Sequence, residues 1–302
     1  MIRLSDEAVD RLRDVAAWPE LPPDRYTVRS LIGRGGMGAV YEAHDRLLDR
    51  AVALKVSNAA TADSGLDERL RQEARVLASL EHPGIVPVHD AGELADGRWF
   101  YVMKLVRGRS LKDHVATLSG EAAVLAVFER IAETVAFAHA ADVIHRDLKP
   151  SNIMVGSFGE VLVLDWGVAT VIGTNAGADE GVRVGTPGFM SPEQAAGDWS
   201  QVRKAADVYS LGALLASMLG AAPSTRRLRA VIAKCNAAQP GDRYANAGDL
   251  ADELARYRAG LSVSAYKEPA WERFGRWFNR YRTFILLVAA YLVMRSLFAW
   301  WR

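Results

Sequence analysis

One short run constrains this chain more than any other: the octapeptide His-Arg-Asp-Leu-Lys-Pro-Ser-Asn at 145–152. It brings a carboxylate, an ammonium group and an amide onto one loop, from Asp147, Lys149 and Asn152. The apolar run 161–164 then has the pattern of a buried strand and leads into Asp165. Carboxylate and amide oxygens are ligands that Mg²⁺ accepts. The fold is therefore expected to bring this loop and this strand end to one cleft.

A glycine-rich segment near the N-terminus is the second informative feature. Gly33, Gly35 and Gly38 stand at G-x-G-x-x-G spacing between two apolar, strand-like segments. The spacing alone is weak evidence, because dinucleotide sites share it, but there the glycines open a helix. Here they lead into 40–43, Val-Tyr-Glu-Ala, which continues as strand. A hairpin loop whose backbone can close over phosphates is therefore favoured over a dinucleotide site.

A lysine and a glutamate follow the glycine segment. Lys55 interrupts the apolar run 51–56, and Glu73 lies in 68–80, where leucines and alanines recur at helical spacing. A lone lysine in a strand is more often solvated, and Glu73 could be an ordinary exposed glutamate. After a glycine loop, however, the run 51–56 resembles the lysine-bearing strand of protein kinases, and this resemblance implies that Lys55 holds the α and β phosphates with Glu73 as its partner.

Three later segments complete the pattern in chain order: 185–193, Gly-Thr-Pro-Gly-Phe-Met-Ser-Pro-Glu; 207–212, Asp-Val-Tyr-Ser-Leu-Gly; and 242–244, Asp-Arg-Tyr. Each alone could be a solvated turn or a helix cap. Together with the earlier motifs they resemble the protein kinase family over about 25–258. On this resemblance the chain is identified as a eukaryotic-like, Hanks-type serine/threonine protein kinase, similar to the membrane-anchored kinases of bacteria.

The resemblance implies an α+β, two-lobed fold. A strand-rich small lobe with its hinge is expected at 25–106, and a helical large lobe at 107–260. Before them, 1–24 reads as a short helix and a proline-rich link. The expected large-lobe helices lie at 120–140, 205–220, 226–238 and 247–259.

The resemblance also implies roles for individual residues and the use of ATP with Mg²⁺. Asp147 is expected to orient the substrate hydroxyl and Lys149 to neutralise the moving phosphoryl group. Asn152 and Asp165 would hold the metal. Met103 would be the gatekeeper, followed by a hinge at 104–106. The residues expected around the nucleotide are Ile32, Gly33, Gly35, Gly36, Gly38, Val40, Ala53, Lys55, Glu73, Met103, Lys104, Val106 and Met154.

Several supporting residues are expected on the same basis. Asp207 would brace the catalytic loop, Arg243 would pair with Glu193, and Arg146 would bind a phosphate or backbone on the activation segment. Trp166 stands where the family usually has Phe and is expected to pack beside Leu77, Val88 and His145. Thr174 is the better-placed phosphate acceptor, although Asp179 and Glu180 could supply built-in negative charge instead.

One departure from the family concerns the stretch between Gly220 and Leu228. It is shorter than usual and leaves no room for a helix that helps to dock protein substrates. The alternative to an active protein kinase is a membrane-tethered pseudokinase or scaffold that binds ATP without turnover. A complete set of Lys55, Asp147, Asn152 and Asp165 argues against it. A small-molecule kinase fits less well, because 149–152 resembles the protein-directed loop.

Composition adds few constraints. The chain has 302 residues, of which 50% are hydrophobic, and a formal net charge of +1, so it is long enough for a large core and has no general attraction to nucleic acid. Its single cysteine, Cys235, excludes an intramolecular disulfide framework. The N-terminal residues lack the pattern of a signal peptide.

The C-terminal region has a different character. The segment 283–301 is strongly apolar except for Arg295, and a helix of about 19 residues would span roughly 28 Å. Arg295 lies beyond the midpoint and could snorkel outward. Within 261–282, aromatic residues share one helical face and arginines the other, as in an interfacial helix. A packed terminal helix is the alternative.

Basic residues precede the apolar segment, so the kinase domain is expected on the cytoplasmic side of a cell membrane that the chain crosses once. The expected partners are protein substrates with Ser or Thr, the membrane, and a second copy for autophosphorylation.

Overall fold

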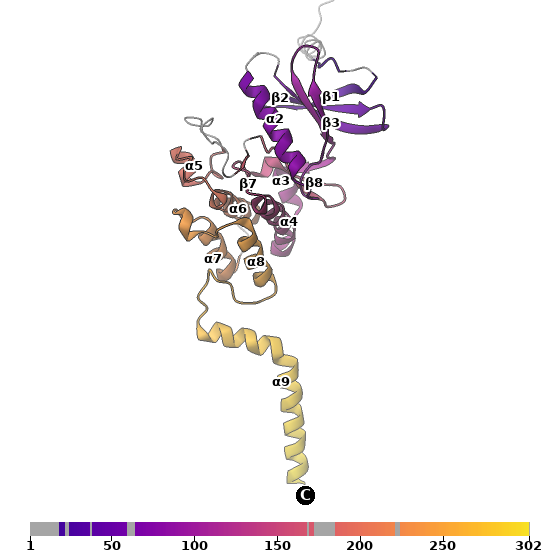
Figure 1. The fold of residues 1–302 in the computed structure, drawn as a ribbon. Helices are drawn as coiled ribbons and strands as arrows, with labels where there is room; N and C mark the ends of the chain where they lie inside the picture. The colour runs from indigo at the N-terminus through magenta and orange to yellow at the C-terminus, as the bar shows by residue number, and fades with distance from the viewer. Residues whose placement is uncertain are drawn as a thin grey trace, which may run out of the picture.

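The computed structural model describes residues 18–21, 24–36, 38–58, 64–167, 169–171, 185–220 and 224–301. A strand-rich lobe lies above a helical lobe, and one long helix leads away from the latter (Figure 1). The expected α+β, two-lobed fold is therefore confirmed.

In the small lobe, the described residues form a five-stranded antiparallel sheet in the order β1-β2-β3-β5-β4. Its strands are β1 (Tyr26–Arg34), β2 (Gly38–Asp45), β3 (Arg50–Ser57), β4 (Val88–Glu93) and β5 (Trp99–Lys104). The register pairs Lys55 of β3 with Val40 of β2 on one side and with Tyr101 of β5 on the other. Lys55 is thereby placed in the middle of the sheet.

The helix α2 (Ser64–Ser79) packs against this sheet and reaches the core below it. Leu70, Ala74 and Leu77 recur at helical spacing and are all buried, which accounts for the face that α2 presents inward. Glu73 lies on the same face and is only 2% exposed. A carboxylate in such a position requires partners inside the lobe.

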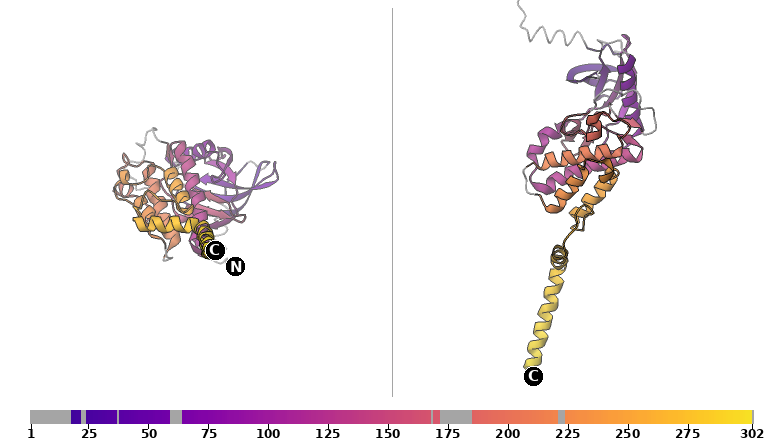
Figure 2. Two further views of the ribbon diagram at one scale, coloured as in Figure 1. Left: turned by 90° about the horizontal axis from the view of Figure 1, so that it is seen from below. Right: turned by 90° about the vertical axis from the view of Figure 1, so that its left-hand side faces the viewer.

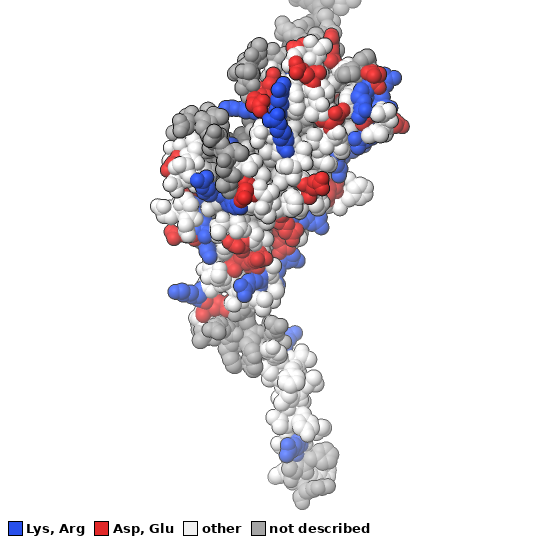
Figure 3. Space-filling model, viewed as in Figure 1, with Lys and Arg blue, Asp and Glu red and all other residues white. Residues whose placement is uncertain are grey.

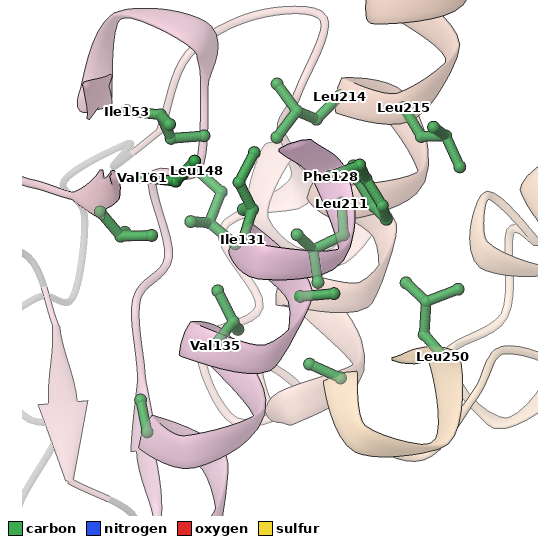
Figure 4. Packing of buried hydrophobic residues seen from close by; sticks show 14 of the residues in the cluster. Phe128, Ile131, Val135, Leu148, Ile153, Val161, Leu211, Leu214, Leu215 and Leu250 are labelled. Atoms are coloured by element: carbon green, nitrogen blue, oxygen red, sulfur yellow. The ribbon is translucent and has the colours of Figure 1, made fainter. Parts of the chain in front are cut away.

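The large lobe is built around α4 (Gly120–Ala140), with α6 (Lys204–Leu219) and α8 (Ala247–Arg258) beside it and α7 (Arg226–Cys235) packed against α6 and α8. Figure 4 shows Phe128, Ile131 and Val135 of α4 among side chains from α6 and α8. All of these side chains are almost completely buried. Each helix begins within one residue of its expected start, because an apolar stripe of helical period must face this core.

Several short helices and strands make up the rest of the described large lobe. They are β6 (Gly108–Ser110), α3 (Leu111–His114), β7 (Val143–Ile144), β8 (Ile153–Gly156), β9 (Val161–Val163), β10 (Thr170–Val171) and α5 (Pro192–Ala196). β8 and β9 form an antiparallel hairpin, which brings the residues just before Ile153 close to those just after Val163. The two halves of the candidate site meet there.

The large lobe continues past Gly260, where the sequence placed its end. Val263 is 3% exposed and belongs to the main apolar cluster. The backbone N–H of Ala265 donates to Oε1 of Glu253 at 3.0 Å, and Arg227 and Glu268 form an ion pair with an N–O distance of 3.2 Å. The segment 261–269 is therefore part of the domain's packing.

After this segment, α9 (Ala270–Trp300) projects away from the domain as two limbs joined by a bend (Figures 1 and 2). Its distal part carries a largely uncharged surface (Figure 3). Phe284, Leu287 and Leu297 are each more than 60% exposed. Within the described part of the chain, no helix combines the length and the apolar character that crossing a membrane requires. The expected span over 283–301 is not confirmed.

Some expectations fall outside the described residues. These are the helix within 1–17, the phosphate acceptor Thr174 and the acidic pair Asp179 and Glu180. The side chains of 270–280, on which the interfacial-helix prediction depends, also lie outside the description.

Candidate active site

The loop at 145–152 is held from below by Asp207 of α6. Its carboxylate accepts hydrogen bonds from the backbone N–H of His145 and of Arg146, both at 2.8 Å, and contacts Nε2 of His139 at 2.9 Å. Burial opposes ionisation of Asp207, yet these partners keep its pKa below the ordinary value. Arg146 has a φ of 69°, a left-handed conformation that costs free energy and that this brace stabilises.

Asp147 is the centre of a compact hydrogen-bonded group. Its Oδ2 accepts from Nζ of Lys149 at 2.7 Å and from Nδ2 of Asn152 at 3.2 Å. Its Oδ1 accepts from the hydroxyl of Thr186 at 2.9 Å, and that hydroxyl accepts from Lys149 at 2.8 Å. The two predicted catalytic residues are thus joined to each other and to a third.

Thr186 is a functional residue that the sequence alone does not reveal. It stands in the segment 185–193, whose pattern assigns no role to this hydroxyl. Its hydroxyl lies within hydrogen-bonding distance of both Asp147 and Lys149, although it is 39 residues from Asp147 in the chain. A hydroxyl between a carboxylate and an ammonium group fixes the orientation of both.

Asn152 and Asp165 meet through the β8–β9 hairpin. The backbone N–H of Leu164 donates to the carbonyl oxygen of Asn152 at 2.7 Å, so the two metal-ligand candidates lie next to each other. The amide nitrogen of Asn152 is committed to Asp147, which leaves the amide oxygen as an acceptor. Asp165 is half exposed, with a carboxylate oxygen 3.6 Å from Nζ of Lys55. This pair of oxygen donors fits a magnesium ion.

Lys55 and Glu73 form the expected ion pair. Nζ of Lys55 lies 2.7 Å from each carboxylate oxygen of Glu73. Burial raises the pKa of the Glu73 carboxyl, and Lys55 acts in the opposite direction. The hydroxyl of Tyr101 adds a further hydrogen bond to Glu73 at 3.0 Å. The sequence predicted the pair but not the tyrosine.

A cavity of about 540 Å³ lies between the glycine loop and this ion pair. Its lining includes these expected nucleotide contacts: Ile32, Gly33, Gly35, Gly36, Gly38, Val40, Lys55, Glu73 and Met103. The metal-ligand candidate Asp165 also lines it. The cavity therefore joins the small-lobe residues to the metal-binding end of the site.

The glycine loop is a hairpin, as predicted. Backbone hydrogen bonds join Gly35 and Gly38 in both directions, and the chain continues directly into β2. A Cβ at Gly38 would lie 2.1 Å from the carbonyl oxygen of Val56, so no side chain fits there. A Cβ at Gly33 or Gly36 would meet no described atom within 4 Å, and both glycines line the cavity.

Four residues expected around the nucleotide lie outside this lining, namely Ala53, Lys104, Val106 and Met154. Ala53 is buried and pairs with Met103 in the sheet. Lys104 is exposed and lines a second cavity of about 690 Å³, together with Leu77 and Val88. Contact of these four residues with a nucleotide stays a prediction.

Trp166 fills the position after Asp165 and is 1% exposed. Its ring centroid lies 4.7 Å from that of His145, and its Nε1–H donates to the carbonyl oxygen of Val163 at 3.1 Å. The indole thus packs against the catalytic loop and satisfies its own polar atom. The larger side chain is accommodated in the position where the family usually has Phe.

The residues that follow the 185–193 segment contact the catalytic loop (145–152) at two points. Nε2 of Gln194 donates to the backbone carbonyl of Arg146 at 2.8 Å, which joins α5 to the catalytic loop. The guanidinium of Arg146 lies over the ring of Trp199, 5.6 Å from its centroid. The segment from α5 to Trp199 and the catalytic loop are therefore packed together.

Comparison with known proteins agrees with this geometry. Residues 26–245 match the protein kinase domain family. The serine/threonine-protein kinase PknH of Mycobacterium tuberculosis is 35% identical over 266 residues, covering 78% of this chain and 42% of PknH. PrkC of Bacillus subtilis is 37% identical over 199 residues, covering 65% of this chain and 30% of PrkC. The chain thus spans less than half the length of either relative.

A solved structure leads to the same conclusion. The kinase domain of M. tuberculosis PknI superposes with a TM-score of 0.60 at 28% identity, covering 78% of this chain and 96% of that domain. This chain therefore belongs to the protein kinase family.

Proposed function

We propose that this chain transfers the γ-phosphoryl group of ATP to serine and threonine hydroxyls of proteins. The observation that carries the proposal is the cluster of Asp147, Lys149 and Thr186 beside a cavity that ends in Lys55 and Asp165. Phosphoryl transfer depends on alignment and charge neutralisation more than on covalent catalysis. The relatives named serine/threonine-protein kinases support the same assignment.

Each residue has a separate task in this proposal. Asp147 orients the incoming hydroxyl and accepts its proton, while Lys149 neutralises charge on the group in transfer. Lys55, aimed by Glu73, binds the phosphates on the small-lobe side. Mg²⁺, held by Asn152 and Asp165, would supply further neutralisation of phosphate charge. Thr186 holds the side chains of Asp147 and Lys149 in their orientations when no substrate is present.

The test is incubation of the purified full chain with γ-labelled ATP, Mg²⁺ and a mixture of protein substrates, followed by mass spectrometry of the modified residues. Asp147→Asn should abolish transfer and leave nucleotide affinity nearly unchanged, because the aspartate acts on the hydroxyl. The matched control is Asp142→Asn, which lies just before the same loop and pairs with Lys204 at the surface.

Three results would reject the proposal. The first is wild-type phosphate incorporation by Asp147→Asn. The second is ATP binding by the wild type with no transfer to any protein, which would support the scaffold alternative. The third is phosphorylation of small molecules alone, which would place the chain in a different class of kinase.

We also propose that α9 attaches the protein to a membrane, with the kinase domain on the cytoplasmic face. Support comes from the exposed apolar side chains of its distal limb and from the basic residues that precede it in the sequence. The full chain should stay with membranes after carbonate washing, whereas a chain ending at Pro269 should not. Release of the full chain by carbonate would reject a spanning anchor.

Autophosphorylation between two copies is the remaining part of the proposal. It predicts a rate of self-labelling that rises with the square of the protein concentration. A first-order dependence would indicate reaction within one copy.

A further inference from the structure

Tyr101 is placed to act on the ion pair of the active site. It lies in β5 at the position paired with Lys55 in β3, and its side chain is almost fully buried. Its hydroxyl donates to Oε1 of Glu73 at 3.0 Å. Tyr101 also lines the cavity that holds Lys55 and Asp165. The phenol of Tyr101 is therefore part of the cavity wall and also contacts the ion pair.

Glu73 needs this support because its surroundings disfavour its charge. It is 2% exposed, and an ionised carboxylate loses its hydration there. Three polar groups face it: Lys55 from β3, Tyr101 from β5 and Asp165 from the loop after β9. Lys55 and Tyr101 favour the ionised form, whereas the negative charge of Asp165 opposes it.

The geometry of the hydrogen bond explains why a tyrosine suits this position. Nζ of Lys55 contacts both oxygens of Glu73, so the carboxylate plane must face the lysine. A second donor on Oε1 prevents rotation of that plane. Burial raises the pKa of the phenol well above its ordinary value, so Tyr101 stays protonated and acts only as a donor.

We propose that Tyr101 is a positioning residue for phosphoryl transfer, which keeps Glu73 ionised and Lys55 aimed at the nucleotide phosphates. This inference rests on the proposed function, because it assigns Tyr101 a part in that reaction. Tyr101 acts through Glu73 and Lys55 and is not itself a catalytic residue.

The decisive variant is Tyr101→Phe, which removes one oxygen and keeps the aromatic ring in the core. Without the phenol, protonation of Glu73 becomes easier, and Lys55 loses its partner as the pH falls. The affinity for Mg·ATP, measured by calorimetry from pH 5.5 to pH 9, should therefore fall about five- to tenfold at pH 6 and less than about twofold at pH 8.5. The kcat/KM for ATP should follow the same pH profile.

The matched control is Tyr26→Phe. Tyr26 is a buried tyrosine of the same sheet whose hydroxyl donates to Asp90 at 2.7 Å, away from the cavity. Loss of this phenol–carboxylate bond should lower the melting temperature less than Tyr101→Phe does, because Asp90 is exposed to water and Glu73 is buried. It should leave the pH profile of nucleotide affinity unchanged.

The inference would be overturned by a pH profile of Tyr101→Phe that coincides with the wild-type profile. An equal loss of affinity at every pH, matching the loss in Tyr26→Phe, would also overturn it, because that result means a structural role. Nucleotide binding is measured without transfer. Failure of the proposed function would appear instead as wild-type binding without any phosphorylated product.

Discussion

Arg243 and Glu193 form a two-point ion pair inside the large lobe, with Nη1–Oε1 at 2.7 Å and Nη2–Oε2 at 2.8 Å. The side chain of Arg243 has no exposed surface. Its other N–H groups donate to the backbone carbonyls of Ala205, Ala237 and Ala238. The pair joins α5 to the turn before α8 and so holds α5 on the large lobe.

Breaking this pair on one side should be strongly destabilising. Arg243→Met leaves the Glu193 carboxylate buried without its partner, and we expect a loss of about 3–5 kcal/mol in the free energy of unfolding. Urea unfolding measures it. The control is Arg75→Met, whose ion pair with Glu68 is exposed on both sides and whose loss should cost less than about 1 kcal/mol. Equal losses in both variants would contradict the interior role of Arg243.

Removal of the Thr186 hydroxyl should affect turnover and spare nucleotide binding. Thr186→Ala frees Asp147 and Lys149 from their common partner, and hydrogen bonds to charged groups contribute about 1.5–3 kcal/mol. We expect kcat to fall about 10- to 100-fold, with the dissociation constant for ATP within about twofold of wild type. Thr186→Ser keeps the hydroxyl and should retain most of the activity. Loss of activity in both variants would indicate that the methyl group matters instead.

The acid sensitivity of the fold should depend on Asp207. Its pKa is lowered in the folded state, so its contribution to stability is present above the unfolded-state value and is lost as the pH falls through the folded-state value. Asp207→Asn replaces an acceptor oxygen by a donor that faces backbone N–H groups. We expect a loss of about 3 kcal/mol at pH 7 and a shallower decrease of stability with falling pH. Urea midpoints between pH 3 and pH 7 measure both effects, and an unchanged pH slope would contradict the assignment.

The domain should need residues beyond Gly260. A chain ending at Gly260 loses the buried side chain of Val263, the hydrogen bond from Ala265 to Glu253 and the ion pair from Glu268 to Arg227. Compared with a chain ending at Pro269, it should be less stable by about 2–4 kcal/mol. Urea unfolding of the two truncated chains provides the comparison, since both lack α9. Equal midpoints would mean that 261–269 adds nothing to the fold.

Much of the site could be predicted from short segments. Asp147, Lys149 and Asn152 lie within one loop, and Asp165 follows a strand that is recognisable from its apolar run. Lys55 and Glu73 are farther apart, yet each lies in a periodic element whose buried face can be read from the pattern. The structure brings these six residues together, because the β8–β9 hairpin and the α2 contact follow from those same patterns.

Two hydrogen bonds of the site join residues that are far apart in the sequence, and no local sequence pattern predicts them. The hydroxyl of Thr186 reaches Asp147, 39 residues earlier in the chain, only through the tertiary fold. Tyr101 reaches Glu73 because the register of β3 and β5 puts it opposite Lys55, and a shift of one residue would turn it to the other face of the sheet.

The sequence by itself therefore determined the family, the order of the lobes and the residues with the charges and oxygen atoms for phosphoryl transfer. Their chemistry depends on residue type and on spacing within a helix, strand or loop, and both can be read along the chain. Only the tertiary structure decided the role of Thr186, the support of Glu73 by Tyr101 and the packing of 261–269 on α7 and α8. The reason is physical: a hydrogen bond requires atoms within about 3 Å, and over long separations that distance is determined by the packing of the whole domain.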